Sequence, residues 1–336
     1  MSEGLLWLDH VSQVFRAGAG EVRAVDDVSL EVGEGEVVCL VGESGSGKTT
    51  SAKIAAGLYR PTAGSVLFQG HDIWHMDSDR FRTYRRAVQY IHQDPYASLN
   101  PIHTVFDTLA APLRHHKLVR NRVEALARAS DLLVTVDLTP PDNFLFKYPH
   151  QLSGGQRQRV SVARALTLQP RLIAADEATS MLDVSIRVSL LNMLKRLCAD
   201  LGVSFVFITH DLAIAKYFAW NGNIAVMYLG RIVEYGPTPT IINSPQHPYT
   251  RALLSAIPEP DPDLTRQRDR IDLRQLEADM LGHLPAGCSF HPRCPYARER
   301  CAVDVPPLYA VSDGHVSACH FFSEVHLTRE VVEKSV

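Results

Sequence analysis

The sequence predicts an α/β fold built around an open parallel β-sheet, and three short apolar runs are the main reason. Residues 37–41 are continuously apolar, which is typical of a strand buried on both faces, and a glycine-rich loop and a helical pattern at 48–56 follow directly. Two further apolar runs, 172–175 and 205–208, each come after a helical stretch. Buried strands that alternate with helices are typical of a parallel sheet.

Two regions outside this sheet show different patterns. Residues 5–15 and 22–32 alternate apolar with polar side chains, which predicts an antiparallel β region before the first buried strand. Residues 105–142 are rich in Leu, Ala, Arg and Glu at helical spacing. We therefore expect a helical insertion there, closed by Pro140 and Pro141.

The C-terminal part of the chain is less regular. Residues 225–236 predict a hairpin that turns near Gly230, and the Pro, Asp and Arg residues over 258–270 predict a linker. Four of the six cysteines lie beyond that linker. In a reducing compartment such a cluster indicates a metal site before disulfides, and a short tail needs a cross-link of this kind for stability.

Composition and charge argue against several classes of protein. Of the 336 residues, 46% are hydrophobic and 21% charged, as in a globular protein. The net charge of −3 gives no basic field, so nucleic acid is not an expected partner. No apolar run reaches the roughly 18 residues that span a bilayer, and residues 1–4 lack the basic start of a secretory signal. We expect a cytoplasmic chain that does not cross a membrane.

Residues 42–49 read GESGSGKT and fit the phosphate-binding pattern G-x-x-x-x-G-K-S/T. The glycines let backbone N–H groups turn toward phosphate oxygens, and the following helix adds its N-terminal dipole. Lys48 is expected to neutralise the β and γ phosphates of ATP, and the Thr49 hydroxyl to bind Mg²⁺. The predicted phosphate-binding residues are Gly42, Ser44, Gly45, Ser46, Gly47, Lys48, Thr49 and Thr50.

Two adjacent carboxylates follow the apolar run 172–175, where a parallel strand ends at a ligand crevice. Asp176 is the expected second protein partner of Mg²⁺. Glu177 is the candidate general base, because a carboxylate beside the metal-binding one is suited to polarising an attacking water.

Residues 152–156 read LSGGQ and, together with the phosphate loop, make the chain resemble the nucleotide-binding subunits of ABC transporters. The resemblance implies a P-loop NTPase cassette with an antiparallel β subdomain and a helical subdomain. In that family this signature loop contacts the γ-phosphate of an ATP molecule held by a partner subunit. The residues implied to complete the partner's site are Ser153, Gly154, Gly155 and Gln156.

Other positions resemble further functional residues of the family. Gln93 is similar to the glutamine that touches Mg²⁺ and the attacking water and relays the nucleotide state to the membrane subunits. Residues 180–183 resemble the D-loop. His210, just after a predicted strand, is similar to the histidine that contacts the γ-phosphate, and Phe15 to the aromatic residue that stacks on adenine.

Residues 93–101 and 247–254 resemble the oligopeptide and dipeptide importer branch of the family. The tail carries the cysteine motif of that branch, which in some members holds an iron–sulfur cluster of the 4Fe-4S type. Zinc is an alternative for four thiolates, although the spacing lacks the usual C-x₂-C pairs, and unliganded cysteines are a third possibility. The candidate ligands are Cys288, Cys294, Cys301 and Cys319.

The resemblance implies an assembly and a division of the chain. Residues 1–245 would form the nucleotide-binding domain, with its helical subdomain at about 94–165, and 246–336 the importer-type extension. The implied partners are two membrane-spanning permease subunits, a second ATP-binding subunit and an extracytoplasmic substrate-binding protein, which places the chain on the cytoplasmic face of the membrane. Di- and oligopeptides are the expected cargo. Nickel or oligosaccharide import, and a soluble ATPase of DNA repair or translation, are the alternatives.

Overall fold

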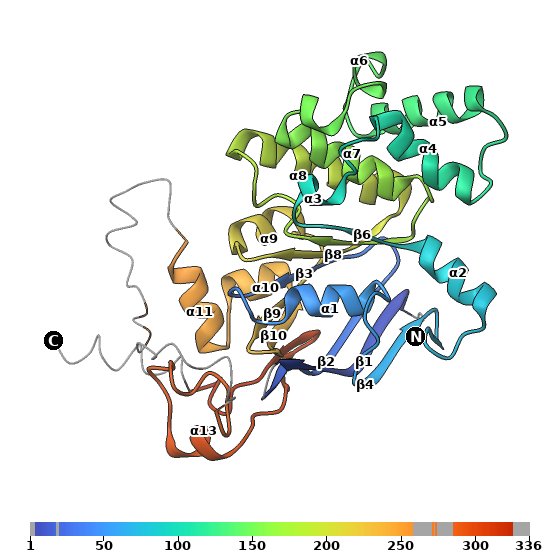
Figure 1. Cartoon of the computed structure of the whole chain (residues 1–336). Helices are drawn as coiled ribbons and strands as arrows, with labels where there is room; N and C mark the ends of the chain where they lie inside the picture. Colours follow the sequence, from blue (N-terminus) through green and yellow to red (C-terminus); the bar gives the residue numbers. More distant parts are fainter. Residues whose placement is uncertain (1–3, 18–19, 258–270, 272, 274–284, 325–336) are drawn as a thin grey trace.

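The computed structural model describes residues 4–17, 20–257, 271, 273 and 285–324, and these form an α/β fold with two sheets (Figure 1). One sheet is antiparallel, with strand order β2-β1-β4-β5, and the other is larger, with order β11-β12-β10-β9-β3-β8-β7-β6. The strands are β1 (Leu6–Ala17), β2 (Gly20–Val32), β3 (Val37–Val41), β4 (Ala63–Phe68), β5 (His71–Asp72), β6 (Val88–Ile91), β7 (Leu172–Asp176), β8 (Ser204–Thr209), β9 (Asn223–Tyr228), β10 (Arg231–Pro237), β11 (Tyr309–Ser312) and β12 (His315–Ser317).

The centre of the large sheet is parallel, as the sequence predicts. β3 pairs with β8 on one side and β9 on the other, and β7 pairs with β8 and β6. Alternate residues of β3 face two separate cores: Cys39 and Val41 pack toward the helical side, while Val38 and Leu40 pack toward β1, β2 and the first helix. The carboxyl ends of β3, β7 and β8 therefore meet at one edge, where ligands of open α/β sheets bind.

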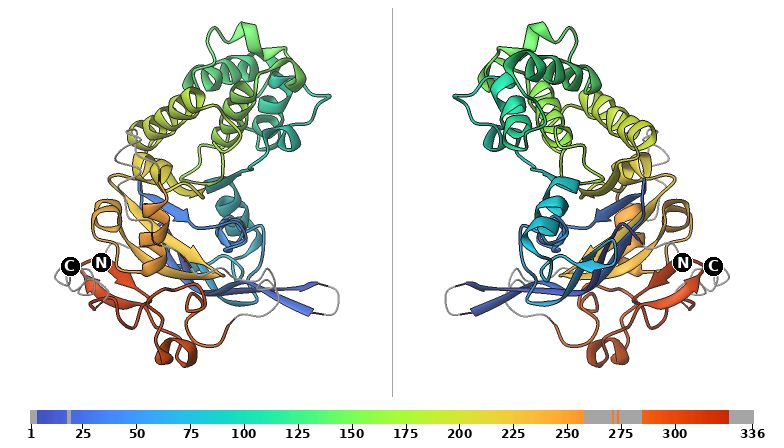
Figure 2. Two further views of the ribbon diagram at one scale, coloured as in Figure 1. Left: turned by 90° about the vertical axis from the view of Figure 1, so that its left-hand side faces the viewer. Right: turned by 90° about the vertical axis from the view of Figure 1, so that its right-hand side faces the viewer.

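Helices cover both faces of this sheet, and most of them lie at the end of the molecule opposite the cysteine-bearing segment (Figures 1 and 2). The long β1–β2 ribbon projects to one side of the body in Figure 2. The helices are α1 (Lys48–Ala55), α2 (Ser78–Ala87), α3 (Pro95–Ser98), α4 (Val105–His115), α5 (Arg122–Thr135), α6 (Asp142–Leu145), η1 (Pro149–Gln151), α7 (Gly154–Leu166), α8 (Val184–Leu201), α9 (Leu212–Phe218), α10 (Thr238–Asn243), α11 (Pro248–Ser255) and α13 (Glu299–Val303).

The helical insertion is confirmed, but its expected end is wrong. Helix α5 already ends at Thr135, and α6 begins directly after Pro141, which occupies its N-cap position. Proline is tolerated where a helix begins, since its missing N–H has no intrahelical partner there. Pro140 and Pro141 therefore introduce another helical turn instead of closing the segment.

The tail beyond residue 285 is joined to the large sheet. β12 pairs with β10, and β11 pairs with β12, so the hairpin of β9 and β10 predicted near Gly230 continues into the tail strands. A buried polar contact supports this junction: His315 Nε2 lies 2.8 Å from Glu234 Oε1, and both side chains are almost fully buried. The linker predicted at 258–270 lies outside the described residues.

No helix in the described ranges combines the length and the apolar character that crossing a bilayer requires.

Candidate active site

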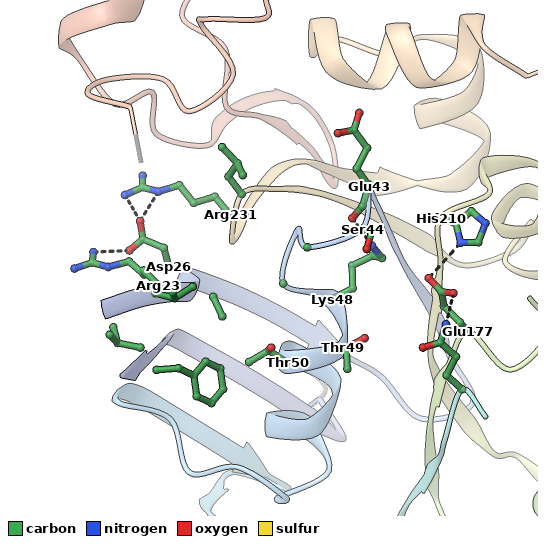
Figure 3. A pocket seen from close by; sticks show the side chains of 18 of the residues that line it. Arg23, Asp26, Glu43, Ser44, Lys48, Thr49, Thr50, Glu177, His210 and Arg231 are labelled. Atoms are coloured by element: carbon green, nitrogen blue, oxygen red, sulfur yellow. Dashed lines mark hydrogen bonds and ion pairs between the residues drawn. The ribbon is translucent and has the colours of Figure 1, made fainter. Parts of the chain in front are cut away.

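A cavity of about 1310 Å³ opens at the carboxyl edge of the large sheet and gathers ten of the predicted site residues (Figure 3). Those that line it are Phe15, Ser44, Gly45, Gly47, Lys48, Thr49, Thr50, Gln93, Glu177 and His210. Ser46 and Asp176 lie just behind its wall, with 3% of each side chain exposed. β3 and α1 position the phosphate loop, while β7 and β8 end at Asp176 and just before His210.

The phosphate loop takes a backbone path that requires glycine at position 47. Gly47 has φ +100° at the start of α1, and a Cβ atom there would lie 2.3 Å from the Ala24 carbonyl oxygen. Only glycine adopts this φ without strain, and only glycine allows so close an approach of two backbones. The loop is thereby held against β2.

Lys48 points into the loop that precedes it. Its ammonium donates to the carbonyl oxygens of Gly42 (2.8 Å) and Glu43 (2.7 Å) and lies 3.3 Å from Ser46 Oγ. Burial lowers its pKa, partly offset by the negative charges of Glu177, Asp176 and Glu43. The cation is thus fixed at the centre of the loop, where it can bind phosphate oxygens with little reorganisation.

Asp176 lies between two hydroxyl groups. The Thr49 hydroxyl donates to its Oδ1 atom (2.9 Å), and the Tyr90 hydroxyl donates to its Oδ2 atom (2.7 Å). Thr49 and Asp176 are the pair expected to hold Mg²⁺, so the contact brings the predicted metal-binding residues together. The sequence does not predict this role of Tyr90, because it depends on β6 pairing beside β7. The available signal was the short β-type segment Val88–Ile91, which lies just before Gln93. Burial, followed by the charge of Asp176, raises the pKa of Tyr90, which keeps the phenol protonated as a donor.

Removing the Tyr90 hydroxyl is expected to weaken magnesium binding. In Tyr90→Phe the Asp176 carboxylate loses one of its two orienting donors, so the Mg²⁺ concentration for half-maximal ATP hydrolysis should rise about tenfold. Tyr217→Phe is the matched control, since that hydroxyl donates to Asn192, which does not line the cavity. Equal Mg²⁺ requirements for the two variants would contradict the role given to Tyr90.

Glu177 is held by two other predicted residues. Gln93 Nε2 donates to its Oε2 atom (2.9 Å). His210 Nδ1 lies 3.2 Å from the Oε1 atom of Glu177, as Figure 3 shows. Its backbone adopts φ +43°, an uncommon conformation for a non-glycine residue, fixed by the N–H group of Glu177 donating to the Ile208 carbonyl (3.1 Å). The Glu177 carboxylate is therefore positioned in the cavity by its backbone conformation and by its contacts with Gln93 and His210.

The LSGGQ segment does not line this cavity. Ser153 is the N-cap of α7: its hydroxyl accepts from the Gln156 N–H (3.3 Å), and the Gln156 side chain accepts from the Ser153 N–H (3.0 Å). This capping box satisfies two N–H groups at the helix start, those of Ser153 and Gln156. The four predicted residues Ser153, Gly154, Gly155 and Gln156 thus lie together at a helix N-terminus, away from the chain's own phosphate loop.

The two glycines of this segment are expected to differ in their tolerance of a side chain. A Cβ at Gly155 would lie 2.5 Å from Cγ2 of Ile186, whereas one at Gly154 would lie 3.7 Å from Leu182. Since the Ile186 methyl is on a stiff β-branched carbon, Gly155→Ala should lower the free energy of unfolding by about 1–3 kcal/mol. Urea denaturation of Gly155→Ala beside Gly154→Ala measures this, and equal stabilities would contradict it.

The outer part of the cavity contains one predicted residue and one unpredicted charge cluster. Phe15 packs edge-on against Tyr59, with 5.7 Å between the ring centroids. Nearby, buried Asp26 binds Arg23 (3.0 Å) and Arg231 (2.6 Å), as Figure 3 shows. The three charges come from β2 and β10, so no local sequence pattern revealed them.

The four cysteines of the tail meet at a second, small cavity. Cys288, Cys294, Cys301 and Cys319 are all free thiols and line a space of about 20 Å³. Burial is the main cause that raises the pKa of Cys294 to about 12 and of Cys319 to about 11, so these thiols are neutral in the chain alone. In the part of the chain that the structure describes, no three His, Cys, Asp or Glu residues are arranged to hold a metal ion.

Two family matches cover different parts of the chain. Residues 25–180 match the ABC transporter family, and residues 233–301 match the C-terminal region of oligopeptide/dipeptide transporters. The first contains the phosphate loop, the LSGGQ segment and Glu177; the second contains three of the four tail cysteines, including Cys301 at its end.

Curated relatives and solved structures agree with these matches. The chain is 43% identical to the "Probable peptide ABC transporter ATP-binding protein y4tS" of Sinorhizobium fredii (95% of this chain, 90% of the relative). It is 39% identical to the oligopeptide transport ATP-binding protein AppF of Bacillus subtilis (93% of each). Its fold is similar to that of the ATP-binding cassette MJ0796 in a post-hydrolysis dimer with ADP and phosphate, with TM-score 0.63 and 31% identity over 69% of this chain and 98% of that one.

The chain therefore belongs to the ATP-binding, ATP-hydrolysing subunits of ABC transporters, in the group that carries the oligopeptide/dipeptide C-terminal region.

Proposed function

We propose that this chain hydrolyses ATP to drive the import of di- or oligopeptides through a pair of permease subunits. The observation that supports it best is the convergence, in one cavity, of Lys48, the Thr49–Asp176 pair, and Glu177 with its two polar neighbours. A phosphate-binding cation, metal-binding oxygens and an oriented carboxylate are the groups that phosphoryl transfer to water needs.

Each group has a distinct role in this mechanism. The loop amides and Lys48 bind the β and γ phosphates, and Glu177 accepts a proton from the water that attacks the γ-phosphorus. The bond between the γ-phosphorus and the β,γ-bridging oxygen breaks, so that ADP leaves and phosphate is formed. His210 contacts the γ-phosphate and, with Gln93, orients Glu177. Thr49, Asp176 and Gln93 would hold Mg²⁺, which neutralises phosphate charge when bound. Phe15 stacks on adenine at the outer end of the cavity.

We propose that two such subunits close face to face on two ATP molecules. The supporting observation is that Ser153, Gly154, Gly155 and Gln156 lie outside the chain's own cavity although they form a helix N-terminus suited to phosphate. In a face-to-face pair each LSGGQ segment would complete the other subunit's site. The partner subunit is a second copy or a homologue, and the pair docks on the cytoplasmic face of the permease.

The proposed organisation of the chain follows from the same assembly. Residues 1–245 form the nucleotide-binding domain, with the helical subdomain at about 94–165, and residues 246–336 form the extension. Helices α3 to α7 fall within that subdomain range, and α11 and the tail strands fall within the extension.

The four tail cysteines are proposed to hold a 4Fe-4S cluster. The type and number of donors support this proposal, because four free thiols line one cavity and such clusters take four thiolates. The cavity is small, so the thiols would have to move outward to admit the cluster. Bound there, the group would supply a cross-link between the loops of a tail that has little core of its own.

Peptide cargo is supported by the names of the relatives and is tested in the assembled importer. The chain is reconstituted in vesicles with its permease subunits, its partner ATPase and the extracytoplasmic binding protein, and ATP hydrolysis is measured. A peptide mixture added with the binding protein should stimulate hydrolysis severalfold. Stimulation by nickel or an oligosaccharide instead of peptides would overturn the assignment of cargo while leaving the ATPase intact.

A further inference from the structure

We propose that Arg293, which lies beside Cys294 in the tail, is a positioning residue for the phosphate loop and acts through Glu43. The inference requires the ATPase activity of the family. It does not depend on the identity of the cargo or on an iron–sulfur cluster. It assigns a role in nucleotide binding to a segment that is far from the phosphate loop in sequence.

Arg293 and Glu43 form a bidentate ion pair, called the fork below. Arg293 Nη1 lies 2.7 Å from Glu43 Oε2, and Arg293 Nη2 lies 3.0 Å from Glu43 Oε1. The arginine side chain is only 20% exposed. Two parallel charge-assisted hydrogen bonds fix both distance and orientation, which a single ammonium contact does not do.

The backbone of Glu43 in turn contacts the groups that are expected to bind phosphate. Its carbonyl oxygen accepts from Lys48 Nζ (2.7 Å) and from the Ser46 N–H (3.2 Å). Its own N–H donates to the Tyr249 hydroxyl (2.9 Å). The C-terminal extension therefore holds both the side chain and the N–H group of Glu43. The carbonyl oxygen of Glu43 binds Lys48 and closes the turn to Ser46.

The extension presents these two groups from a rigid aromatic cluster. Tyr249 and Phe290 are almost fully buried, and their ring centroids lie 5.4 Å apart. Tyr228 packs on both, at 4.7 Å and 5.2 Å, and the Arg293 guanidinium lies 5.8 Å from the Tyr228 ring centroid. The guanidinium is thus supported by packing and is not a free surface charge.

The contact also joins two segments with separate family matches. Glu43 lies within residues 25–180, which match the ABC transporter family, while Tyr249 and Arg293 lie within residues 233–301, which match the C-terminal region. The extension thus contacts the phosphate loop from behind, through Tyr249 and Arg293.

Steady-state ATP hydrolysis by Arg293→Gln, Glu43→Gln and the double variant tests this inference in the full chain. Each single variant should raise the KM for ATP about fivefold with little change in kcat, and the double variant should show no further increase. Arg293→Lys should behave like Arg293→Gln, because lysine keeps the charge but loses the fork. Arg300→Gln is the control from the same segment, since exposed Arg300 pairs with exposed Asp304 and the substitution should leave KM unchanged.

The sign of the Glu43 effect separates positioning from simple charge. If the two residues acted only through their charge on the phosphates, Arg293→Gln would raise KM while Glu43→Gln would lower it, and the proposal would be overturned. Effects that multiply in the double variant, or an unchanged KM in Arg293→Gln, would overturn it as well. Because Glu43 lies outside the cysteine segment, a higher KM in Glu43→Gln with an unaltered free energy of unfolding supports the loop contact and rules out damage to the tail.

Discussion

Glu177→Gln should reduce steady-state ATP hydrolysis by at least about a hundredfold while leaving ATP binding intact. The glutamine keeps the size of the side chain but removes the base that accepts a proton from the attacking water. It can still contact Gln93 and His210, which bind the carboxylate at 2.9 Å and 3.2 Å, so the local geometry should change little. With hydrolysis blocked, ATP should accumulate in a closed pair of subunits, seen as an ATP-dependent dimer by size-exclusion chromatography.

Glu21→Gln is the matched control for this experiment. Glu21 also lines the cavity, but its carboxylate is exposed and lies 3.8 Å from exposed Arg16. In the sequence it is far from Thr49 and Asp176, the residues expected to hold Mg²⁺. Hydrolysis by this variant should stay close to that of the unaltered chain. Rapid turnover by Glu177→Gln would show that another group activates the water, and His210 would then be the first residue to test.

The sequence predicted the parts of the site that are local in the chain. Asp176 ends a buried strand, and the phosphate loop and Glu177 each directly follow one, so their place at the carboxyl edge could be predicted from the apolar pattern. Gln93 and His210 came from resemblance, and the structure places both within hydrogen-bonding distance of Glu177.

The parts that were missed depend on pairings between distant segments. Tyr90 reaches Asp176 because β6 lies beside β7, and Arg231 reaches Asp26 because β10 lies near β2. Neither neighbour can be inferred from periodicity, which reports the faces of a strand but not the strand next to it. Arg293 is a stronger example, since 250 positions separate it from Glu43.

The error at Pro140 and Pro141 has a different origin. The sequence pattern predicts that the prolines end a helical region, whereas they precede α6 and lie between two helices. A proline stops the helix before it and permits the helix after it, so one pattern is compatible with both outcomes. Only the polar residue that follows, Asp142 in the first turn of α6, favoured a new start.

Cys294→Ser is expected to remove most of the iron and acid-labile sulfide from the chain when it is purified without oxygen. The unaltered chain should contain about four of each, with a broad brown absorbance, because four thiolates support one 4Fe-4S cluster. Cys294 is buried among the other three thiols, and a serine hydroxyl is a poor substitute for a thiolate ligand.

Cys198→Ser is the control for this measurement, because Cys198 lies on α8 with its thiol donating to the Gly35 carbonyl (3.2 Å), outside the cysteine cavity. That variant should retain its iron. Zinc, or no metal at all, in the unaltered chain would contradict the cluster but would not alter the ATP site, whose contacts to Arg293 and Tyr249 are made by protein atoms alone. The KM for ATP of Cys294→Ser, compared with that of Arg293→Gln, then distinguishes two roles of the tail. An unchanged KM in Cys294→Ser would mean that the contact of Arg293 with Glu43 persists without the metal. A rise equal to that of Arg293→Gln would mean that the cysteine site holds Arg293 in place.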